Sequence, residues 1–459
     1  MSQELRRSSL SAAQIVVLGF LAAVFLGTSL LMIPFASTAT GSAAFWPSVF
    51  TAVSAICVTG LSTVDPATHW TGFGQVVIML LIQMGGLGIM TVASILGLVL
   101  AQKSSLKTRL NTSAESQALG LSDFRKVLVR VLQLTAIIEF VIAVILSLRL
   151  HYGYGEEWGL ALWHGLFHSI SSFNNAGFAL YSDNLMSFQS DPIIQLTIDG
   201  AIILGGLGFP VLIETYRRFG LKLIGKRPIQ AGMPTHWSLH ASIVYSMTGI
   251  LLVVGTIYFG WLEWNNPATL GPMTFGDKML NSFTASVMPR TAGFNTIDIS
   301  QMSPTSWLGT DLLMFIGGAS AGTAGGIKIT TLAVLIFIVL TEIRGDTAVN
   351  VGTRRLPRSI QRQALAIVSM ASATVIFAIL FLHVITPFST DQIAFEVFSA
   401  FGTVGLTTGI TSKLSEPAQV VIMLLMFTGR VGTVLIASAL ARRVTKKHYE
   451  LPRERPIIG

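Results

Sequence analysis

The sequence is short of charge, since only 11% of its 459 residues are Asp, Glu, Lys or Arg, whereas a soluble protein carries about 25%. It has one cysteine, Cys57, which excludes an intrachain disulfide framework and any metal site built from several cysteines. Hydrophobic residues make up 51% of the chain, and the mean hydropathy is +0.67. This composition excludes a soluble globular protein and indicates a polytopic membrane protein.

Eight apolar runs are long enough to cross about 30 Å of hydrocarbon at 1.5 Å per residue. They lie near 14–34, 74–101, 127–148, 192–215, 238–261, 306–340, 363–386 and 418–441. Each pair encloses a shorter run, near 45–56, 158–173, 275–288 and 390–401. The short runs are interpreted as re-entrant half-helices, which are tolerated where they are buried in protein or line a watery cavity. The expected fold is an all-α integral membrane protein with eight transmembrane helices.

One short segment recurs four times, each time after a half-helix. The copies are AICVTGLS at 55–62, SFNNAGFA at 172–179, SVMPRTAGFNTI at 286–297 and AFGTVGLT at 400–407. Their glycines, Gly60, Gly177, Gly293 and Gly405, are spaced by 117, 116 and 112 residues. Four copies suggest a ring about a four-fold pseudo-axis, and a ring of backbone carbonyls at membrane depth is one way to strip a cation of water and select it.

Each repeat is expected to consist of an outer helix, a half-helix, a glycine segment and an inner helix. The expected repeats are 10–102, 126–220, 236–345 and 360–445, followed by a C-terminal tail at 446–459. Ser389 and Gln392 have the spacing of a capping box at the start of the fourth half-helix.

Basic residues are concentrated on one side of the predicted membrane. With eight crossings both termini share a side, and 24 of the 30 Lys and Arg fall on it. Arg149, Lys278, Arg290 and Lys413 are expected on the other side, and Lys328 and Arg430 within helices. The positive-inside rule then places both termini in the cytoplasm.

The inner helices carry a second glycine repeat, 24 to 28 residues after the first, at 85–88, 205–208, 317–318 and 429–432. In the first two units close helix packing is the expected reason. The third unit departs, because five glycines fall within 317–328 and each costs about 1 kcal/mol of helix stability. We expect a loop that faces the pore, since lipid cannot satisfy its backbone groups. It is a candidate gate, and a static broken helix is the alternative.

Arg430 lies in the fourth inner helix, next to the glycine that matches Gly85, Gly205 and Gly317. A charge at mid-membrane costs at least about 2.5–3.5 kcal/mol, so its side chain must face protein or water. We expect it to face the pore below the glycine segments and to oppose free cation passage. The alternative is a structural ion pair with Glu139, Asp199 or Asp311.

Other motifs carry less weight. His164 and His168 share a helix face at a spacing that can hold a metal, but no third ligand is apparent. The segment 322–328 faintly resembles a phosphate loop but lacks its Gly-Lys-Ser/Thr core and follows no strand. No nucleophile–base pattern stands out, which argues against an enzyme.

The glycine segments, the break at 317–328 and Arg430 together resemble the Trk/Ktr/HKT superfamily of potassium transporters. The resemblance covers roughly residues 10–445 and is nearest to the Ktr-type membrane subunit. It implies a K+-selective filter as the one metal site. By motif the filter residues are Val58, Thr59, Gly60, Asn175, Ala176, Gly177, Thr291, Ala292, Gly293, Thr403, Val404 and Gly405.

The resemblance also implies a gate formed by an intramembrane loop and a pore-blocking arginine, Arg430. The loop residues are Gly317, Gly318, Ala319, Ser320, Ala321, Gly322, Thr323, Ala324, Gly325, Gly326 and Lys328. It implies a homodimer in the bacterial cell membrane on a cytoplasmic RCK-type ring, with no nucleic acid as partner. ATP or ADP on that ring, not on this chain, would control opening, and Na+ is a candidate stimulating ion.

The segments differ from the Thr-Val-Gly-Tyr-Gly filter of K+ channels, because they share only one glycine each. Fewer left-handed residues and a less uniform filter are therefore expected. Family members that prefer Na+ carry serine at the first filter glycine, and Gly60 argues against that preference.

An ion-coupled secondary transporter of another small cation or solute is the second hypothesis. Such transporters often have inverted repeats with two broken helices. The four repeats here all run in the same direction, which favours a channel-like ring.

Overall fold

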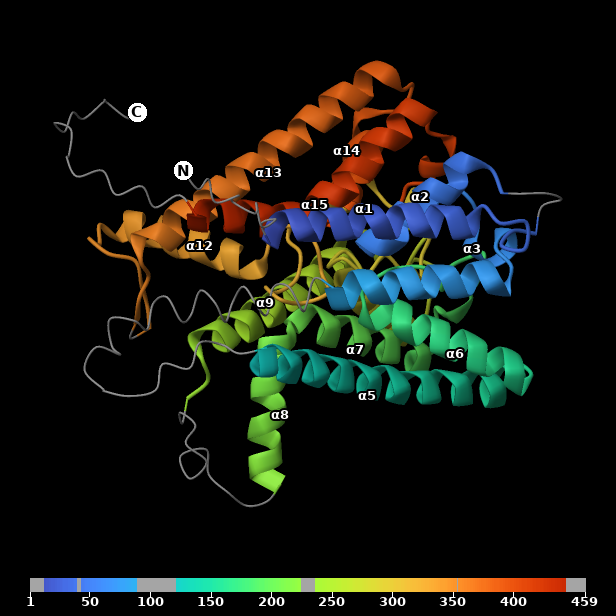
Figure 1. Cartoon of the computed structure of the whole chain (residues 1–459), viewed down its shortest axis with the longest axis horizontal. Helices are drawn as coiled ribbons and strands as arrows, with labels where there is room; N and C mark the ends of the chain where they lie inside the picture. The colour runs from blue at the N-terminus through green and yellow to red at the C-terminus, as the bar shows by residue number, and fades with distance from the viewer. Residues whose placement is uncertain (1–11, 39–42, 89–120, 224–235, 353, 443–459) are drawn as a thin grey trace, which may run out of the picture.

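The computed structural model describes residues 12–38, 43–88, 121–223, 236–352 and 354–442. The described chain is almost entirely helical, and most of its long helices run side by side (Figure 1). Helix α1 begins and helix α15 ends at the same side of the molecule, on the left in Figure 1. The described residues are therefore mostly helical, which agrees with the expected all-α fold class.

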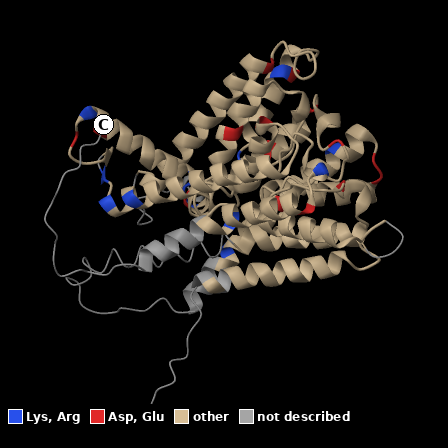
Figure 2. Ribbon diagram, turned by 90° about the horizontal axis from the view of Figure 1, so that it is seen from above, with Lys and Arg blue, Asp and Glu red and all other residues tan. Residues whose placement is uncertain are grey.

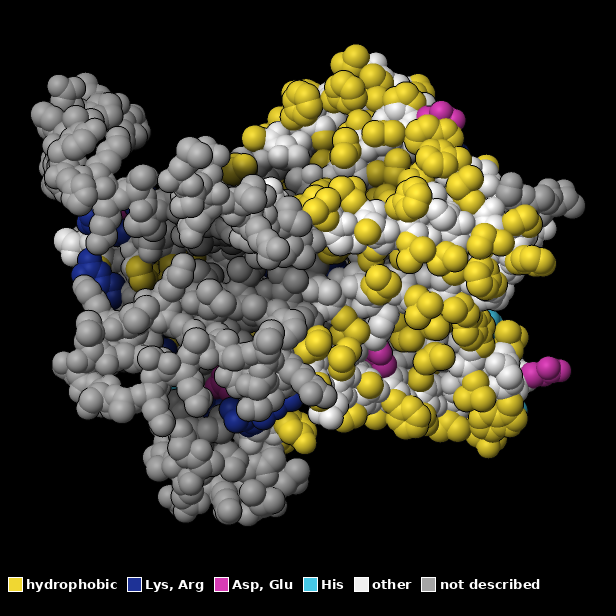
Figure 3. All heavy atoms as spheres, in the orientation of Figure 1, with side chains coloured by type: hydrophobic (Ala, Val, Ile, Leu, Met, Phe, Trp, Pro, Cys, Tyr) yellow, Lys and Arg dark blue, Asp and Glu magenta, His cyan; other side chains and the backbone are white. Residues whose placement is uncertain are grey.

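Four long helices form the outer layer: α1 (Ala12–Leu31), α5 (Leu121–Tyr154), α9 (Leu239–Glu263) and α13 (Arg358–Ile385). Their outward faces are apolar; α13, for example, exposes Phe377, Leu380 and Val384. Charged residues are sparse along the ribbons (Figure 2), and hydrophobic side chains cover much of the visible described surface (Figure 3). Such faces suit contact with lipid.

Four shorter helices match the four short apolar runs closely: α2 (Phe45–Cys57), α6 (Trp158–Phe173), α10 (Phe275–Val287) and α14 (Thr390–Gly402). The expected capping box of α14 is confirmed, because the Ser389 side chain accepts from the Gln392 amide while the Gln392 side chain accepts from the Ser389 amide. Helices α2 and α14 end where Val58 and Thr403 adopt left-handed backbone conformations. These turns end the helices at the glycine segments.

Two of the four inner helices begin at well-defined caps. The inner helices comprise a helix over Gly72–Gly88, α7 (Pro192–Leu207), α11 (Pro304–Phe315) and α15 (Glu416–Arg442). Asp191 and Ser303 cap α7 and α11, and proline occupies the first turn of each. Among the described residues three helices are long and apolar enough to span a membrane, or four if α7 and α8 count as one. The predicted number of eight stays a prediction.

The second inner helix is not continuous, contrary to the expected run over 192–215. It breaks at Gly208, and α8 (Phe209–Leu223) leaves α7 at a bend of 106° (Figure 1). Gly208 has φ +83°, which favours glycine, and Pro210 follows in the first turn of α8. Close packing alone therefore does not explain the glycines at 205–208.

The third inner helix is interrupted between α11 and α12 (Ile329–Arg344). The intervening residues, 316–328, are non-helical, and Ile316 and Ile327 form an isolated parallel bridge. After α12 a small antiparallel hairpin, β1 (Asn350–Val351) and β2 (Arg354–Arg355), leads to α13. The described connections contain one short α-helix and three 3-10 turns: α3 (Pro66–His69), η1 (Met186–Phe188), η3 (Ile299–Gln301) and η4 (Thr411–Lys413).

The inner helices join neighbouring units. Helix α7 contacts α10, α11 contacts α14, and α15 contacts α2. The helix over 72–88 reaches the second unit through side chains: Trp163 donates to Gln75 over 2.9 Å, and Asn174 donates to Gln83 over 2.7 Å. Each of the first three inner helices thus contacts the short helix or the segment of the unit that follows it along the chain, and the last of them, α15, contacts α2.

Candidate functional site

The four aligned glycines meet in cyclic order. A Cβ placed on Gly60 would lie 2.4 Å from the Ala176 carbonyl oxygen, and one on Gly177 would lie 2.7 Å from that of Ala292. A Cβ on Gly293 would lie 2.2 Å from the Val404 carbonyl oxygen, and one on Gly405 would lie 2.2 Å from the Thr59 carbonyl oxygen. Each segment thus presses against the next, and the fourth against the first. Only glycine leaves room for this ring.

Each segment contains two left-handed residues at matching positions, two residues apart. Val58, Asn175, Thr291 and Thr403 have φ between +51° and +70°, and the four glycines have φ between +70° and +99°. The expectation that only the shared glycine of each segment is left-handed is therefore wrong, whereas the comparison with the filter of K+ channels stays a prediction. That expectation counted glycines only, whereas three β-branched residues and an asparagine also adopt this conformation, which is a genuine outlier for β-branched residues.

The amides of the segments turn away from the ring, back to the ends of the half-helices. Thr59, Ala176 and Val404 donate their N–H groups to the carbonyls of Ser54, Ser171 and Ser399. The amides of Gly60 and Gly405 donate to the hydroxyls of Ser54 and Ser399, both over 3.1 Å. Within the described chain no hydrogen bond ends on the carbonyl oxygens of 58–60, 175–177, 291–293 or 403–405. These oxygens remain available to a cation.

The half-helices add to the negative potential that the carbonyl oxygens create at the ring. All four end within a few residues of their ring glycines, so their C-terminal ends lie near the ring. A helix C-terminus carries about half a negative charge. The arrangement therefore favours a cation at the centre.

A cavity of about 570 Å³ opens on one side of the ring. Its lining includes Gly60, Gly177 and Gly405, and three carboxylates, Asp65, Asp183 and Asp298. Lys413 is also part of the wall. The acidic side chains outnumber the basic one and would concentrate cations at this mouth.

On the inner helices, the second glycine repeat allows close approach to the half-helices. A Cβ on Gly85, Gly205 or Gly429 would lie 2.0, 2.0 or 1.8 Å from the carbonyl oxygen of Ile56, Phe173 or Phe401. Each of these oxygens belongs to the residue four positions before a ring glycine. Close packing at Gly85 and Gly205 is thus confirmed. The glycines place the inner helices directly behind the ring.

The loop over 316–328 is held by backbone bonds to the break between α7 and α8. The Ala319 and Thr323 amides donate to the carbonyls of Gly206 and Gly205 over 2.8 and 3.2 Å, and the Phe209 amide donates to Ala321 over 3.1 Å. The break in the second unit thus provides the groups that hold the loop of the third. The loop also touches the ring segments, since the Thr323 hydroxyl donates to the Asn175 side chain over 2.9 Å.

Two cationic side chains contact the backbone of this loop: Arg430 of α15, and Lys328 at the end of the loop itself. The Arg430 guanidinium donates to the Thr323 carbonyl in the loop and, over 3.3 Å, to the Gly85 carbonyl; its side chain is 2% exposed. The Lys328 ammonium donates to the Ala324 and Gly325 carbonyls over 2.5 and 3.2 Å. Within the described residues Arg430 forms no ion pair with Glu139, Asp199 or Asp311. Glu139 and Asp199 bond to neutral side chains instead, and one carboxylate oxygen of Asp311 has no hydrogen-bond partner. The structure therefore gives no support to the ion-pair alternative.

Arg290 was counted with the basic residues on the side opposite the termini, and that side stays a prediction. The structure adds that its side chain is buried, with 4% exposed, and reaches Thr248 of α9 over 3.4 Å. Its carbonyl accepts from the Asn175 side chain, also over 3.4 Å. The signal was present, because Arg290 stands three residues before Gly293 and so aligns with Cys57 and Asn174 at the end of a half-helix.

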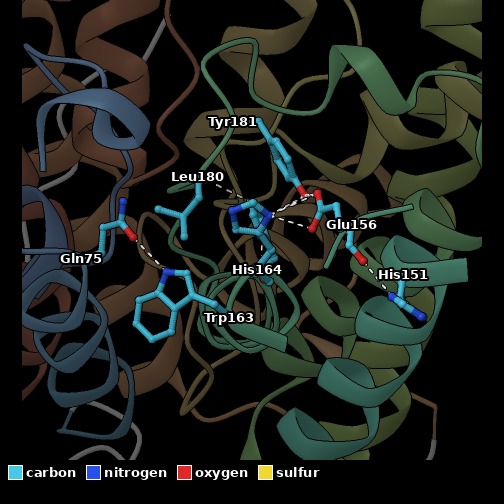
Figure 4. Close-up of polar contacts among 8 residues, drawn as sticks. Gln75, His151, Glu156, Trp163, His164, Leu180 and Tyr181 are labelled. Atoms are coloured by element: carbon cyan, nitrogen blue, oxygen red, sulfur yellow. Dashed lines mark hydrogen bonds and ion pairs between the residues drawn. The ribbon is translucent and has the colours of Figure 1, made fainter. Parts of the chain in front are cut away.

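The two histidines of α6 support the second segment from behind. His164 Nδ1 lies 3.1 Å from a Glu156 carboxylate oxygen and 3.0 Å from the Tyr181 hydroxyl, and these three side chains converge in Figure 4. His168 uses both ring nitrogens, with the His164 carbonyl and with the Leu180 amide. Neither His168 nitrogen is free for a metal, so the histidines fix the chain that follows Gly177.

Comparison with known proteins identifies the family. The TrkH family, described as cation transport proteins, matches residues 3–449. The chain is 41% identical to the Ktr system potassium uptake protein B of Bacillus subtilis, over 94% of this chain and 93% of that protein. It is 35% identical to the potassium/sodium uptake protein NtpJ of Enterococcus hirae, over 99% and 98%.

A solved structure has the same fold. The crystal structure of the potassium transporter TrkH from Vibrio parahaemolyticus superposes with a TM-score of 0.75 at 15% identity, covering 97% of this chain and 88% of that one. Relatives and family alike are membrane transporters rather than enzymes. The chain belongs to the TrkH family of cation transport proteins.

Proposed function

We propose that this chain is the pore-forming subunit of a K+ uptake system in the cell membrane. The names of its relatives, potassium uptake and potassium/sodium uptake proteins, support the choice of ion. The membrane potential would drive entry with about 2.3 kcal/mol per charge for each 100 mV.

The observation that carries this proposal is the closed ring of four segments with unpaired carbonyl oxygens. Those oxygens would replace the water shell of K+ as the ion passes. The filter would comprise residues 58–60, 175–177, 291–293 and 403–405, one segment from each of four repeats at 10–102, 126–220, 236–345 and 360–445. Eight crossings would carry the repeats.

The loop over 317–328 and Arg430 would form the gate. The loop lies against the Asn175 side chain of the second segment, and Arg430 and Lys328 bring two positive charges to it. A passing cation would meet both charges, so movement of the loop would be required for flow.

Control would come from the cytoplasm. The charge pattern supports cytoplasmic termini, and the basic linkers would face a ring of nucleotide-binding regulatory subunits whose ATP or ADP controls opening. The name of the Bacillus subtilis relative, part of a Ktr system, supports a system of more than one component. Two copies of the chain would form a homodimer, and Na+ would stimulate uptake.

The test is ion uptake by K+-starved cells that carry the chain with Gly293→Ser. Gly293 has φ +73° and its Cβ would lie 2.2 Å from the Val404 oxygen, so serine must displace one side of the ring. We expect K+ uptake to fall at least roughly tenfold and discrimination against Na+ to weaken, since tenfold needs only about 1.4 kcal/mol. Gly200→Ala in α7, with open space around its Cβ, is the matched control. Unchanged selectivity in Gly293→Ser would count against the filter.

A coupled secondary transporter remains the second candidate, because two inner helices are broken, one at Gly208 and one over 316–328. The two breaks of this chain, however, contact each other beside the ring and form no separate substrate site among the described residues. Uptake that saturates with an organic solute, and not with K+, would favour it.

A further inference from the structure

A groove between α5 and α8 lies apart from the ring. It encloses about 320 Å³ and is lined by α5 and the helix that follows the break at Gly208. Leu134 and Ile213 form part of its wall and pack against the buried residues Val131 and Phe209. Ile137 and Tyr216 flank it and are 61% and 71% exposed. Gln133 also lines the groove, so its aliphatic wall is bordered by polar side chains and is open outward.

Two arginines complete the groove. Arg130 and Arg217 both line it and are both exposed. No ion pair within the described residues involves either one. On α5, Arg130, Leu134 and Ile137 follow helical spacing along one face, so the charge lies at one end of an apolar stripe. The groove thus joins a positive end to an apolar body.

The groove also lies at the edge of the apolar span. In the sequence, Asp123, Arg125 and Lys126 precede the apolar run that begins near residue 127, three residues before Arg130. This end of α5 lies on the side where α1 begins and α15 ends (left in Figure 1), and some of the basic side chains visible in Figure 3 lie there too. With the proposed topology this is the cytoplasmic leaflet, where anionic lipids are enriched and basic pockets between helices bind their headgroups.

We propose that this groove binds an anionic phospholipid of the cytoplasmic leaflet. Arg130 and Arg217 receive the headgroup phosphate, the Tyr216 hydroxyl is a further donor within the same lining, and an acyl chain lies along Leu134, Ile137 and Ile213. A zwitterionic lipid fits less well because its choline repels the two arginines. The site goes beyond the proposed transport function and uses none of its residues.

The site would also affect the loop over 316–328. Helix α8 starts at Phe209, whose amide bonds to the loop at Ala321. A lipid held between α5 and α8 fixes the direction of α8 and thereby the residues that hold the loop.

The experiment measures lipid retention by the purified full chain in detergent, by native mass spectrometry. The probes are dioleoylphosphatidylglycerol and dioleoylphosphatidylcholine. The wild type should retain one more phosphatidylglycerol per chain than Arg130→Gln/Arg217→Gln, with affinity differing by on the order of 30-fold, since each basic residue near an anionic surface contributes roughly fivefold. Arg354→Gln/Arg355→Gln, on the exposed strand β2, removes the same charge elsewhere and should retain the lipid.

A second variant, Ile137→Trp, fills the groove without changing its charge and should also release the lipid. Any of four results would overturn the proposal. The groove variants could retain as much phosphatidylglycerol as the wild type, or the β2 control could lose as much as the groove variants. The wild type could prefer phosphatidylcholine, or inorganic phosphate alone could release the lipid. Co-purification of a protein that occupies the groove in place of lipid would overturn it too. Because retention is measured without transport, such a failure would leave the proposed K+ pathway untouched.

Discussion

At the scale of single residues, the ring depends on backbone conformations that its side chains resist. Val58, Thr291 and Thr403 are β-branched and have positive φ. A conformation of this kind costs about 1–3 kcal/mol and persists only where its surroundings enforce it. Here the surroundings are the half-helix ends, which take up the segment amides, and the neighbouring segments, which fill the space at each glycine. With these conformations the segment carbonyls accept no hydrogen bond within the described chain.

Arg430→Gln tests the charge beside the loop. Glutamine keeps a donor for the Thr323 carbonyl but removes a positive charge, which opposes a cation 4–8 Å away by about 2–4 kcal/mol at an effective dielectric of about 20. We expect K+ flux into liposomes to rise more than tenfold when no regulatory partner is present. Arg430→Lys keeps the charge and should stay near the wild-type flux. Equal flux in all three proteins would show that the charge does not limit passage.

At the scale of elements, the breaks in the second and third inner helices stabilise each other through backbone hydrogen bonds. The break at Gly208 leaves the carbonyls of Gly205 and Gly206 available, and the loop amides take them up. Neither break would be stable alone, because unpaired backbone groups at membrane depth are costly. The position of α8 therefore bears directly on the loop.

Gly208→Ala tests this coupling. Its φ of +83° strains alanine, and the new Cβ would lie 2.7 Å from the Ser320 carbonyl oxygen. We expect the loop to be displaced and K+ flux to increase at least severalfold in liposomes. Gly206→Ala is the control, because its Cβ would meet only an ordinary contact at 3.9 Å. The coupling would be rejected if the two variants had the same flux as the wild type.

The capping box of α14 makes a separate prediction for stability. Ser389→Ala removes the acceptor of the Gln392 amide and should cost about 0.5–2 kcal/mol. The midpoint of thermal unfolding in detergent should therefore fall, whereas Ser389→Thr, which keeps the hydroxyl, should stay closer to the wild type. A midpoint unchanged by alanine would mean that tertiary packing alone fixes the start of this half-helix.

At the scale of the whole molecule, the sequence predicted the four half-helices within a few residues. Apolar runs that are too short to span a membrane and are followed by a glycine segment indicate re-entrant half-helices. The sequence also placed the ring segments by their repeat. It did not predict the break at Gly208, because the glycines at 85–88 and 205–208 have the same pattern, and the difference lies in Pro210 and in a loop from another unit. Left-handed valine and threonine also carry no signal in sequence.

The central claim is that four segments jointly replace the water shell of K+. A crystal of the full chain grown with Tl+ in place of K+ tests it most directly, through anomalous difference density. The account predicts a peak on the axis enclosed by the carbonyls of Thr59, Ala176, Ala292 and Val404. Density confined to other parts of the molecule, with none inside the ring, would contradict it.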